Sequence, residues 1–227
     1  MKLAEELERI RADFEQRGDP RYVEAYRVGI AQLLASALVA DSVAVGQPMP
    51  SFLLPNVEGR LVDSAELLAR GPLVVSFFRG EWCRFCRPAL AALREAAPAI
   101  AAAGASLVAI TPDTGEAATD AKRKLALPFD ILSDADGGVG LAFGILFRLP
   151  EAILDVFQAD GPDLPLRHGN EAWTLPVPAT YVVDRDGIVR FRFVDPDFRR
   201  RAEPDDILTA LRSLPAGRTG SAPASGG

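Results

Sequence analysis

Histidine, cysteine and long apolar runs are scarce in this chain of 227 residues. It contains one histidine, His168, and two cysteines. Without a second cysteine pair or a second histidine, cysteine and histidine alone cannot complete a four-ligand zinc site. Two cysteines are also too few for the disulfide framework of a small secreted scaffold. We therefore expect no metal and no other cofactor.

A basic surface and a membrane-spanning segment are missing as well. The formal net charge is -6 and the pI is near 5.0, whereas affinity for nucleic acid depends largely on clustered Lys and Arg. The most apolar stretch, residues 30–46, is interrupted by Asp41 before it reaches the roughly 20 residues that span a bilayer. The opening MKLAEELERI lacks the apolar core of a secretory signal. We expect a cytoplasmic protein that binds neither nucleic acid nor membrane.

Two helices are predicted in an N-terminal extension, residues 1–44. Apolar residues recur at helical spacing in both, and Asp19 with Pro20 is typical of the start of the second helix. These helices must pack on the main domain or on a second subunit. At the other end, residues 215–227 are rich in Pro, Gly and Ser and are expected to be disordered.

Residues 45–214 are predicted to form one α/β domain, because apolar β-branched runs alternate with helical segments. The central run, LVVSFF at residues 73–78, is typical of a strand covered on both faces. The helix after it is expected to break or kink at Pro98. For residues 144–176 we expect one short helix and a loop, followed by a β-hairpin that turns at Asp186–Gly187.

Both cysteines, Cys83 and Cys86, lie in FFRGEWCRFCRPAL, between that strand and that helix. A thiol reacts as its thiolate, so a redox cysteine needs surroundings that favour the anion. Here a helix N-terminus and a local net charge of +2 lower the thiol pKa; the charge comes from Arg79, Arg84, Arg87 and Glu81. We expect Cys83 to be the exposed nucleophile and Cys86 its resolving partner. Buried filler residues and half of a metal site are the alternatives.

Three segments resemble a known family. RGEWCRFCRPAL resembles the W-C-x-x-C stretch of the thioredoxin fold. VGQPMPSFLLPNVEGRLV and VPATYVVDRDGIVRF resemble parts of the alkyl hydroperoxide reductase / thiol-specific antioxidant (AhpC/TSA) group, the peroxiredoxins and their relatives. The resemblance covers roughly residues 45–214. It implies a thioredoxin-like three-layer α/β/α sandwich with a central mixed sheet, preceded by the N-terminal helical pair.

The resemblance also assigns roles to individual residues. It implies that Cys83 is the peroxidatic and Cys86 the resolving cysteine, and that Pro178 takes the position of a cis-proline facing the sulfurs. Residues expected to bind substrate or to stabilise the thiolate are Arg79, Gly80, Trp82 and Pro178.

The chain departs from the peroxiredoxin pattern at three positions. Peroxiredoxins place Pro seven residues and Thr or Ser three residues before the nucleophile, where this chain has Ser76 and Gly80. They also carry Arg before the final Ala-Thr pair, where this chain has Pro178. Arg79 is the candidate source of the missing positive charge.

Three functions are compatible with these residues. The first is a thiol peroxidase that reduces hydrogen peroxide or organic hydroperoxides and is reset by a thioredoxin-like reductant. The second is a thiol–disulfide oxidoreductase acting on a disulfide substrate. The third is a non-catalytic binding module. The resemblance further implies a homodimer. The lone His168 and the basic Arg199–Arg201 are interpreted as solvated, the latter also as a dimer contact.

Overall fold

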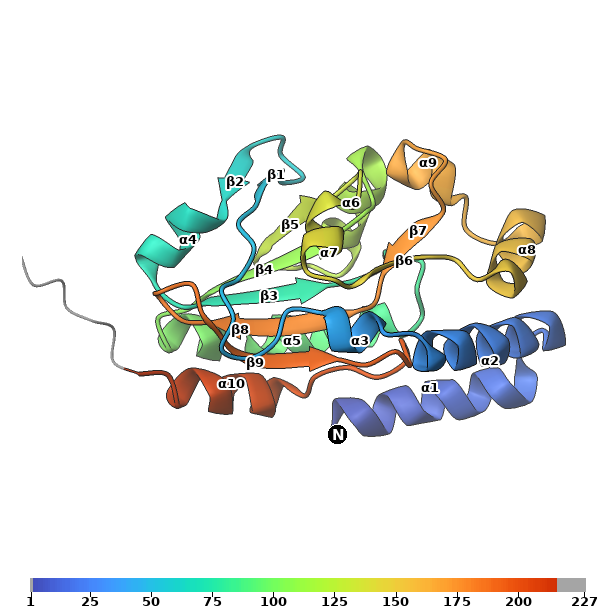
Figure 1. Ribbon diagram of the computed structural model, residues 1–227, viewed down its shortest axis with the longest axis horizontal. Coiled ribbons are helices and arrows are strands. Elements are labelled where there is room, and N and C mark those ends of the chain that lie inside the picture. The colour runs from blue at the N-terminus through green and yellow to red at the C-terminus, as the bar shows by residue number, and fades with distance from the viewer. Residues whose placement is uncertain (1, 216–227) are drawn as a thin grey trace, which may run out of the picture.

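A five-stranded mixed sheet forms the centre of the computed structural model, which describes residues 2–215. The strand order is β5-β4-β3-β8-β9. The bounds are β3 Leu73–Phe77, β4 Ser106–Thr111, β5 Asp130–Ser133, β8 Ala179–Val183 and β9 Val189–Val194. β3 pairs in parallel with β4 and antiparallel with β8, and all five of its residues are buried, as the apolar run predicts (Figure 1). The tail predicted for residues 215–227 lies outside the described residues, apart from its first residue.

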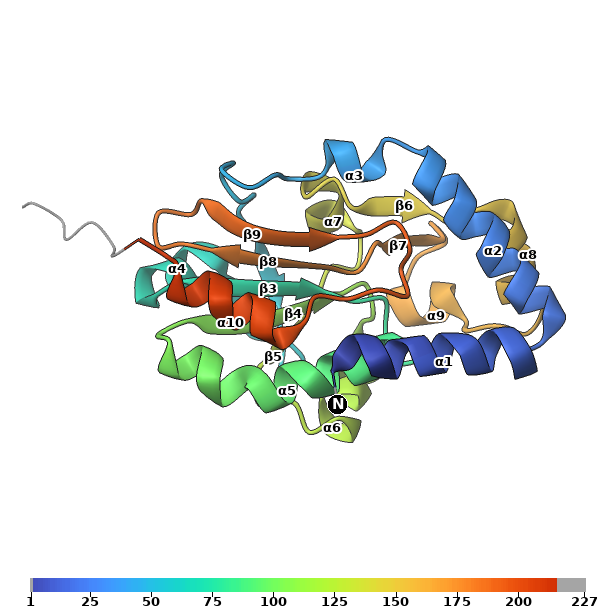
Figure 2. The same cartoon turned by 90° about the horizontal axis from the view of Figure 1, so that it is seen from below.

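Helices cover both faces of this sheet (Figures 1 and 2). On one face lie α5 Cys86–Ala102 and α10 Pro204–Arg212. On the other lie α4 Ser64–Arg70, α6 Gly115–Lys124 and α7 Gly138–Ala142. The predicted three-layer α/β/α sandwich with a mixed sheet is confirmed. None of the helices found between residues 2 and 215 has the length and hydrophobicity that a membrane span requires.

α5 continues without a break through Pro98, so the predicted break is wrong. A proline inside a helix removes one hydrogen bond, which would be made to the carbonyl four residues earlier. Pro98 lies on the exposed side of α5, where water can bind the freed carbonyl. Meanwhile the buried side chains of Leu93 and Ile100 hold the helix on the sheet on both sides of the proline.

The segment 144–176 contains more structure than one helix and a loop. It forms β6 Leu146–Arg148, α8 Glu151–Asp160, α9 Leu164–His168 and β7 Thr174–Pro176. β6 and β7 pair antiparallel, with Leu146 opposite Pro176. This pairing joins residues far apart in the sequence, so no local hydrophobic period indicates it. A second small pair is formed by β1 Leu53–Pro55 and β2 Leu61–Asp63.

The N-terminal helices pack on their own domain. They are α1 Leu3–Arg17, α2 Pro20–Ala35 and α3 Leu38–Asp41. As predicted, α2 begins after Asp19, whose side chain accepts a hydrogen bond from the backbone N–H of Arg21. α1 packs against α5, and α2 packs against α8 (Figure 2). The two helices therefore lie over the end of the domain at which α5 begins.

The packing of α2 is testable with two aliphatic residues of the same helix. Ile30 is 5% exposed and Leu34 is 60% exposed. Ile30→Ala should lower the free energy of unfolding by about 2–4 kcal/mol, because it leaves a cavity in the core. Leu34→Ala should change it by less than about 0.5 kcal/mol. Urea denaturation measures both, and equal effects would show that α2 does not pack as described.

Candidate active site

The turn between β3 and α5 positions the two cysteines. Gly80, in this turn, has a φ of 139°, and a Cβ there would lie 2.3 Å from Trp82 Nε1 and 2.7 Å from Asp113 Oδ2. Only glycine fits this position. The Gly80 carbonyl accepts a hydrogen bond from the Cys83 N–H at 3.2 Å, and the Cys83 carbonyl accepts one from the Cys86 N–H at 2.9 Å. The cysteines therefore lie on one tight turn, and α5 itself begins at Cys86.

Both sulfurs are enclosed by the protein. Cys83 is 2% exposed and Cys86 is 0% exposed, and both are free thiols. The expectation of an exposed Cys83 is wrong for this state of the protein. The cause is tertiary, because the N-terminal helices and the segment between β9 and α10 cover the turn. The cavity at Cys86 has a volume of only about 10 Å³, at the lower limit for a single water molecule.

Arg79 supplies the positive charge beside Cys83. Its side chain is 0% exposed, and its Nη2 donates to Cys83 Sγ at 3.3 Å. Burial opposes a charge on Arg79, but the thiolate of Cys83 raises the pKa of the guanidinium above its ordinary value. Arg79 Nε and Nη1 are buried without a hydrogen-bond partner among the described residues. Arg79 thus contacts the Cys83 sulfur through Nη2, while Nε and Nη1 make no hydrogen bond to the described residues.

The environment sets the two cysteines to opposite protonation states. Burial by itself would raise the pKa of the Cys83 thiol. The hydrogen bond from Cys86 and the charges of Arg79 and Arg201 outweigh burial and lower this pKa well below its ordinary value. For Cys86, burial and the neighbouring Cys83 raise the pKa well above its ordinary value. The pKa of Cys83 is therefore the lower of the two, and Cys83 is the sulfur that forms a thiolate more readily.

The second arginine of the site comes from a distant segment. Arg201 Nη2 donates to Cys86 Sγ at 3.1 Å, so its interpretation as a solvated residue is wrong. Of the arginines expected to act, Arg84 lies over the Phe14 ring at 4.6 Å and Arg87 pairs with Glu81 at 2.7 Å. Nothing local in the sequence indicated Arg201, since its approach depends on the path of the chain after β9.

Aromatic rings from three segments surround the Arg79 guanidinium. Its Cζ lies 4.0 Å from the ring centroid of Phe198, 5.2 Å from that of Trp82 and 6.0 Å from that of Tyr26. Cation–π contacts of this kind stabilise a cation that has lost its water. Trp82 belongs to the turn, Tyr26 to α2, and Phe198 to the segment before α10. Sequence analysis identified Trp82 but not the other two.

Pro178 lies at the same end of the sheet, but its peptide bond differs from the expectation. Ala179, the next residue, pairs with Phe77 at the end of β3. Between residues 2 and 215 there is no cis peptide bond, so the cis-proline implied by the resemblance is absent. The chain enters β8 in extended form, and the N–H of Val177 donates to the Ile145 carbonyl at 2.8 Å.

A buried polar cluster lies behind the Gly80 turn. Asp113 is 0% exposed and accepts two hydrogen bonds from Arg167, at 3.0 and 2.7 Å. His168 is 3% exposed, with Nε2 3.8 Å from Asp113 Oδ1, so its interpretation as solvated is wrong. Burial and the charge of Arg167 lower the pKa of His168 to about 4. His168 is neutral at pH 7 and packs as part of α9.

The fold and the site together define a thioredoxin-like protein with two buried free cysteines, each in contact with an arginine. Residues 45–192 match the model of the AhpC/TSA family. This chain belongs to the AhpC/TSA family of peroxiredoxin-type oxidoreductases.

Named relatives fit this assignment. The chain is 28% identical over 193 residues to "Peroxiredoxin Q, chloroplastic" of Sedum lineare, covering 85% of this chain and 90% of the relative. It is 27% identical to "Peroxiredoxin Q, chloroplastic" of Oryza sativa subsp. japonica, over 78% of this chain and 70% of the relative. The fold is similar to that of peroxidoxin BcpB from Mycobacterium tuberculosis, with a TM-score of 0.60 at 23% identity over 76% of this chain and 98% of the other.

Removal of the Arg79 charge should raise the pKa of Cys83. In Arg79→Met, burial acts without the compensating cation, and the midpoint of thiolate formation should rise by more than about one pH unit, or about 1.4 kcal/mol. Ultraviolet absorbance of the thiolate during a pH titration measures this. Arg84→Met, in the same turn but with its guanidinium on Phe14, is the matched control and should titrate like the unchanged protein. Equal shifts in both variants would contradict the role of Arg79.

His168 should make the protein less stable in acid. Its pKa is lower in the folded than in the unfolded state, so its contribution is present above pH 6.5 and is lost as pH falls toward 4. The full loss is about 3 kcal/mol. Urea unfolding between pH 7 and pH 4 should therefore show a steeper loss of stability for the unchanged protein than for His168→Gln. Parallel curves would show that His168 is not buried as a neutral group.

Proposed function

We propose that this protein is a thiol peroxidase of the peroxiredoxin Q type that uses Cys83 as the nucleophile. The Cys83 thiolate attacks the terminal oxygen of a hydroperoxide, and the O–O bond breaks. Cys83 becomes a sulfenic acid, while the leaving alkoxide or hydroxide takes a proton from solvent. Because the charges of Arg79 and Arg201 lower the pKa of Cys83, the site needs no separate base to remove its proton.

The observation that carries this proposal is the buried Arg79 with two of its nitrogens unpaired. Buried donors without partners are rare in native proteins and call for an explanation. Arg79 holds Cys83 through Nη2, which leaves Nε and Nη1 to donate to the peroxide oxygens. Negative charge develops on the leaving oxygen in the transition state, and a fixed cation in a dry site stabilises it.

Cys86 completes the reaction as the resolving cysteine. As its sulfur attacks the sulfenic sulfur of Cys83, its proton passes to the sulfenic oxygen; an S–S bond forms, and the oxygen leaves as water. Both cysteines lie on one tight turn, in which the Cys83 carbonyl accepts a hydrogen bond from the Cys86 N–H at 2.9 Å. We therefore expect the disulfide to form with little movement of the backbone, and two electrons from an external thiol then reset the pair.

The thiol–disulfide oxidoreductase remains the second candidate, because the CxxC spacing favours it. Enclosure of both sulfurs argues against it, since the disulfide of a folded protein must reach Cys83 directly to be attacked. A non-catalytic binding module is disfavoured by the thiol of lowered pKa beside an arginine with two buried nitrogens that lack partners, since perturbed groups of this kind cluster at functional sites.

Partners and location stay predictions. The resemblance implies a thioredoxin-like reductant and a homodimer, and the sequence suggests a cytoplasmic protein. The N-terminal helices pack on their own domain with one face, and their outward faces stay a candidate dimer surface. Sedimentation measures whether a dimer forms.

Mixing the reduced protein with hydrogen peroxide or an alkyl hydroperoxide tests the proposal directly. Stopped-flow fluorescence of Trp82 should report oxidation far faster than that of a free thiol, and mass spectrometry should find the Cys83–Cys86 disulfide. Cys83→Ser should abolish the rapid phase. Cys86→Ser should keep it but stop at the sulfenic acid without turnover.

Two results separate the candidates. Oxidation no faster than that of a free thiol would exclude the peroxidase. Reduction of insulin disulfides that depends on Cys83, without peroxide activity, would establish the oxidoreductase instead. Trp82→Phe serves as the control that assigns the fluorescence change to the residue beside Arg79.

A further inference from the structure

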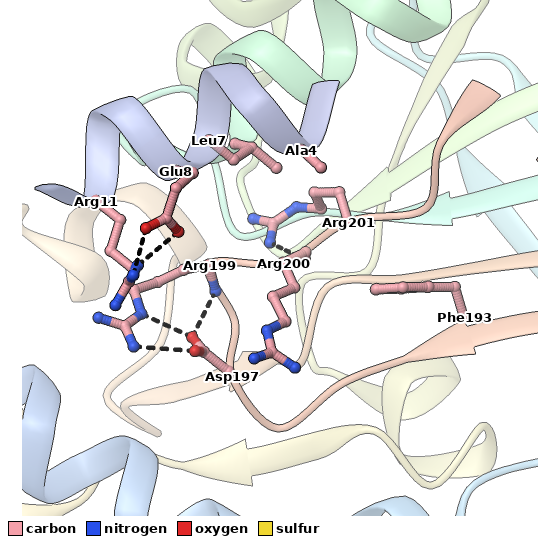
Figure 3. Close-up of a pocket in the computed structure, with 9 residues that line it drawn as sticks. All are labelled: Ala4, Leu7, Glu8, Arg11, Phe193, Asp197, Arg199, Arg200 and Arg201. Carbon is pink, nitrogen blue, oxygen red and sulfur yellow. Dashed lines mark hydrogen bonds and ion pairs between the residues drawn. The ribbon is translucent and has the colours of Figure 1, made fainter. Parts of the chain in front are cut away.

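A separate pocket lies beside the cysteine pair, between α1 and the segment that follows β9 (Figure 3). Its volume is about 430 Å³, within the range of about 300–1,000 Å³ that is usual for small-molecule sites. It is lined by Ala4, Leu7, Glu8, Arg11, Phe193, Asp197, Arg199, Arg200 and Arg201. All of these residues lie outside residues 45–192, the part of the chain that matches the family model.

The pocket is basic in a protein that is acidic overall. Four arginines and two acidic residues line it. The acids are each paired with one of these arginines, Glu8 with Arg11 and Asp197 with Arg199. Arg200 is 70% exposed and forms an ion pair with Asp195 at 3.2 Å. Exposed ion pairs of this kind contribute little to stability. Apolar side chains, including Leu7, form the rest of the wall.

Arg201 connects this pocket to the cysteines. It lines the pocket and also the cavity of about 10 Å³ at Cys86. Its Nη2 donates to Cys86 Sγ, while Nη1 donates to the carbonyls of Phe198 and Arg200. A molecule in the pocket is therefore separated from the sulfur of Cys86 by a single guanidinium group.

We propose that this pocket binds a small thiol that carries a carboxylate, and that this thiol reduces the Cys83–Cys86 disulfide. The proposal rests on the proposed function, because a peroxidase of this type needs an electron donor. Arg200 and Arg201 bind the carboxylate, and the apolar wall holds the short chain between the carboxylate and the sulfur. This donor takes the place of the thioredoxin-like protein that the resemblance implies.

The position of the pocket matches the chemistry of disulfide reduction. The donor thiolate attacks the sulfur of Cys86, which forms a mixed disulfide and releases Cys83 as a thiolate. A disulfide breaks more readily when the sulfur that leaves has the lower pKa, and here that sulfur is Cys83. A second donor molecule attacks the donor sulfur of the mixed disulfide and gives up its proton to Cys86. Two donor thiols become one disulfide, and the protein gains two electrons.

The enclosure of the site favours a small donor over a protein. Both sulfurs are buried, and side chains from α2, the turn and the segment before α10 surround Arg79, which contacts Cys83. In the disulfide, Cys86 has no thiol group to accept a hydrogen bond from Arg201. The Arg201 guanidinium can then donate to an anion in the pocket. A protein surface would instead have to displace the N-terminal helices.

Re-reduction of the disulfide by two thiols of the same shape tests this proposal. The disulfide is prepared with the chemical oxidant diamide, so the experiment does not depend on peroxide activity. Stopped-flow rates with 3-mercaptopropionate and with its neutral amide, each expressed per thiolate, are then compared. The rate with 3-mercaptopropionate should be about tenfold higher than the rate with its amide, which is the lower end of the rate enhancements that electrostatic steering gives. Added salt should reduce this difference.

Arg200→Gln should bring the ratio of the two rates close to one. Arg60→Gln is the matched control, because Arg60 is also 70% exposed and pairs with an aspartate, Asp130, at 3.2 Å. It removes the same charge far from the pocket and should keep the preference. Equal rates in the unchanged protein, or a preference that survives in Arg200→Gln, would overturn the proposal. Much faster reduction by a thioredoxin, at the same rate in Arg200→Gln, would overturn it too.

Discussion

The hydrogen-bonded pair of Arg79 and Cys83 is the interaction on which the rest of the site depends. A guanidinium without water is costly to bury, and so is a thiolate, but each lowers the cost of the other at 3.3 Å. The arrangement persists only if water stays out and the geometry is fixed. Gly80 fixes the turn, because no other residue fits between Trp82 and Asp113. Loss of either charge would leave the other one unpaired in the interior.

Segments near the two ends of the chain exclude water from the Arg79–Cys83 pair. Tyr26 from α2 and Phe198 from the segment before α10 pack around the Arg79 guanidinium. Neither residue lies within residues 45–192, the part that matches the AhpC/TSA model. The family core therefore supplies the thiolate and its arginine, whereas the additions decide how the site is closed and what can reach it. Arg201, also outside the match, adds the second guanidinium.

Much of the fold follows from local patterns. The apolar run of β3 and the Asp186–Gly187 hairpin are encoded by neighbouring residues, and they are where the sequence predicts them. The Asp19 cap that starts α2 is a local signal of the same kind. The β6–β7 pair was not predictable in this way, since Leu146 and Pro176 meet only after the chain between them has folded. Pro98 is the opposite case. Proline is a local signal that ends a helix, but the packing of α5 on the sheet keeps the helix continuous.

Local sequence pattern is enough to predict that the two sulfurs lie together. A CxxC between a buried strand and a helix places Cys83 and Cys86 on one turn, and Arg79 is close to them in the chain. The enclosure of Cys83, and the contact of Cys86 with Arg201 in place of a neighbouring arginine, follow from the packing of distant segments. The burial of Cys83 and the position of Arg201 depend on which distant segments pack over the turn. No local spacing of residues predicts that packing.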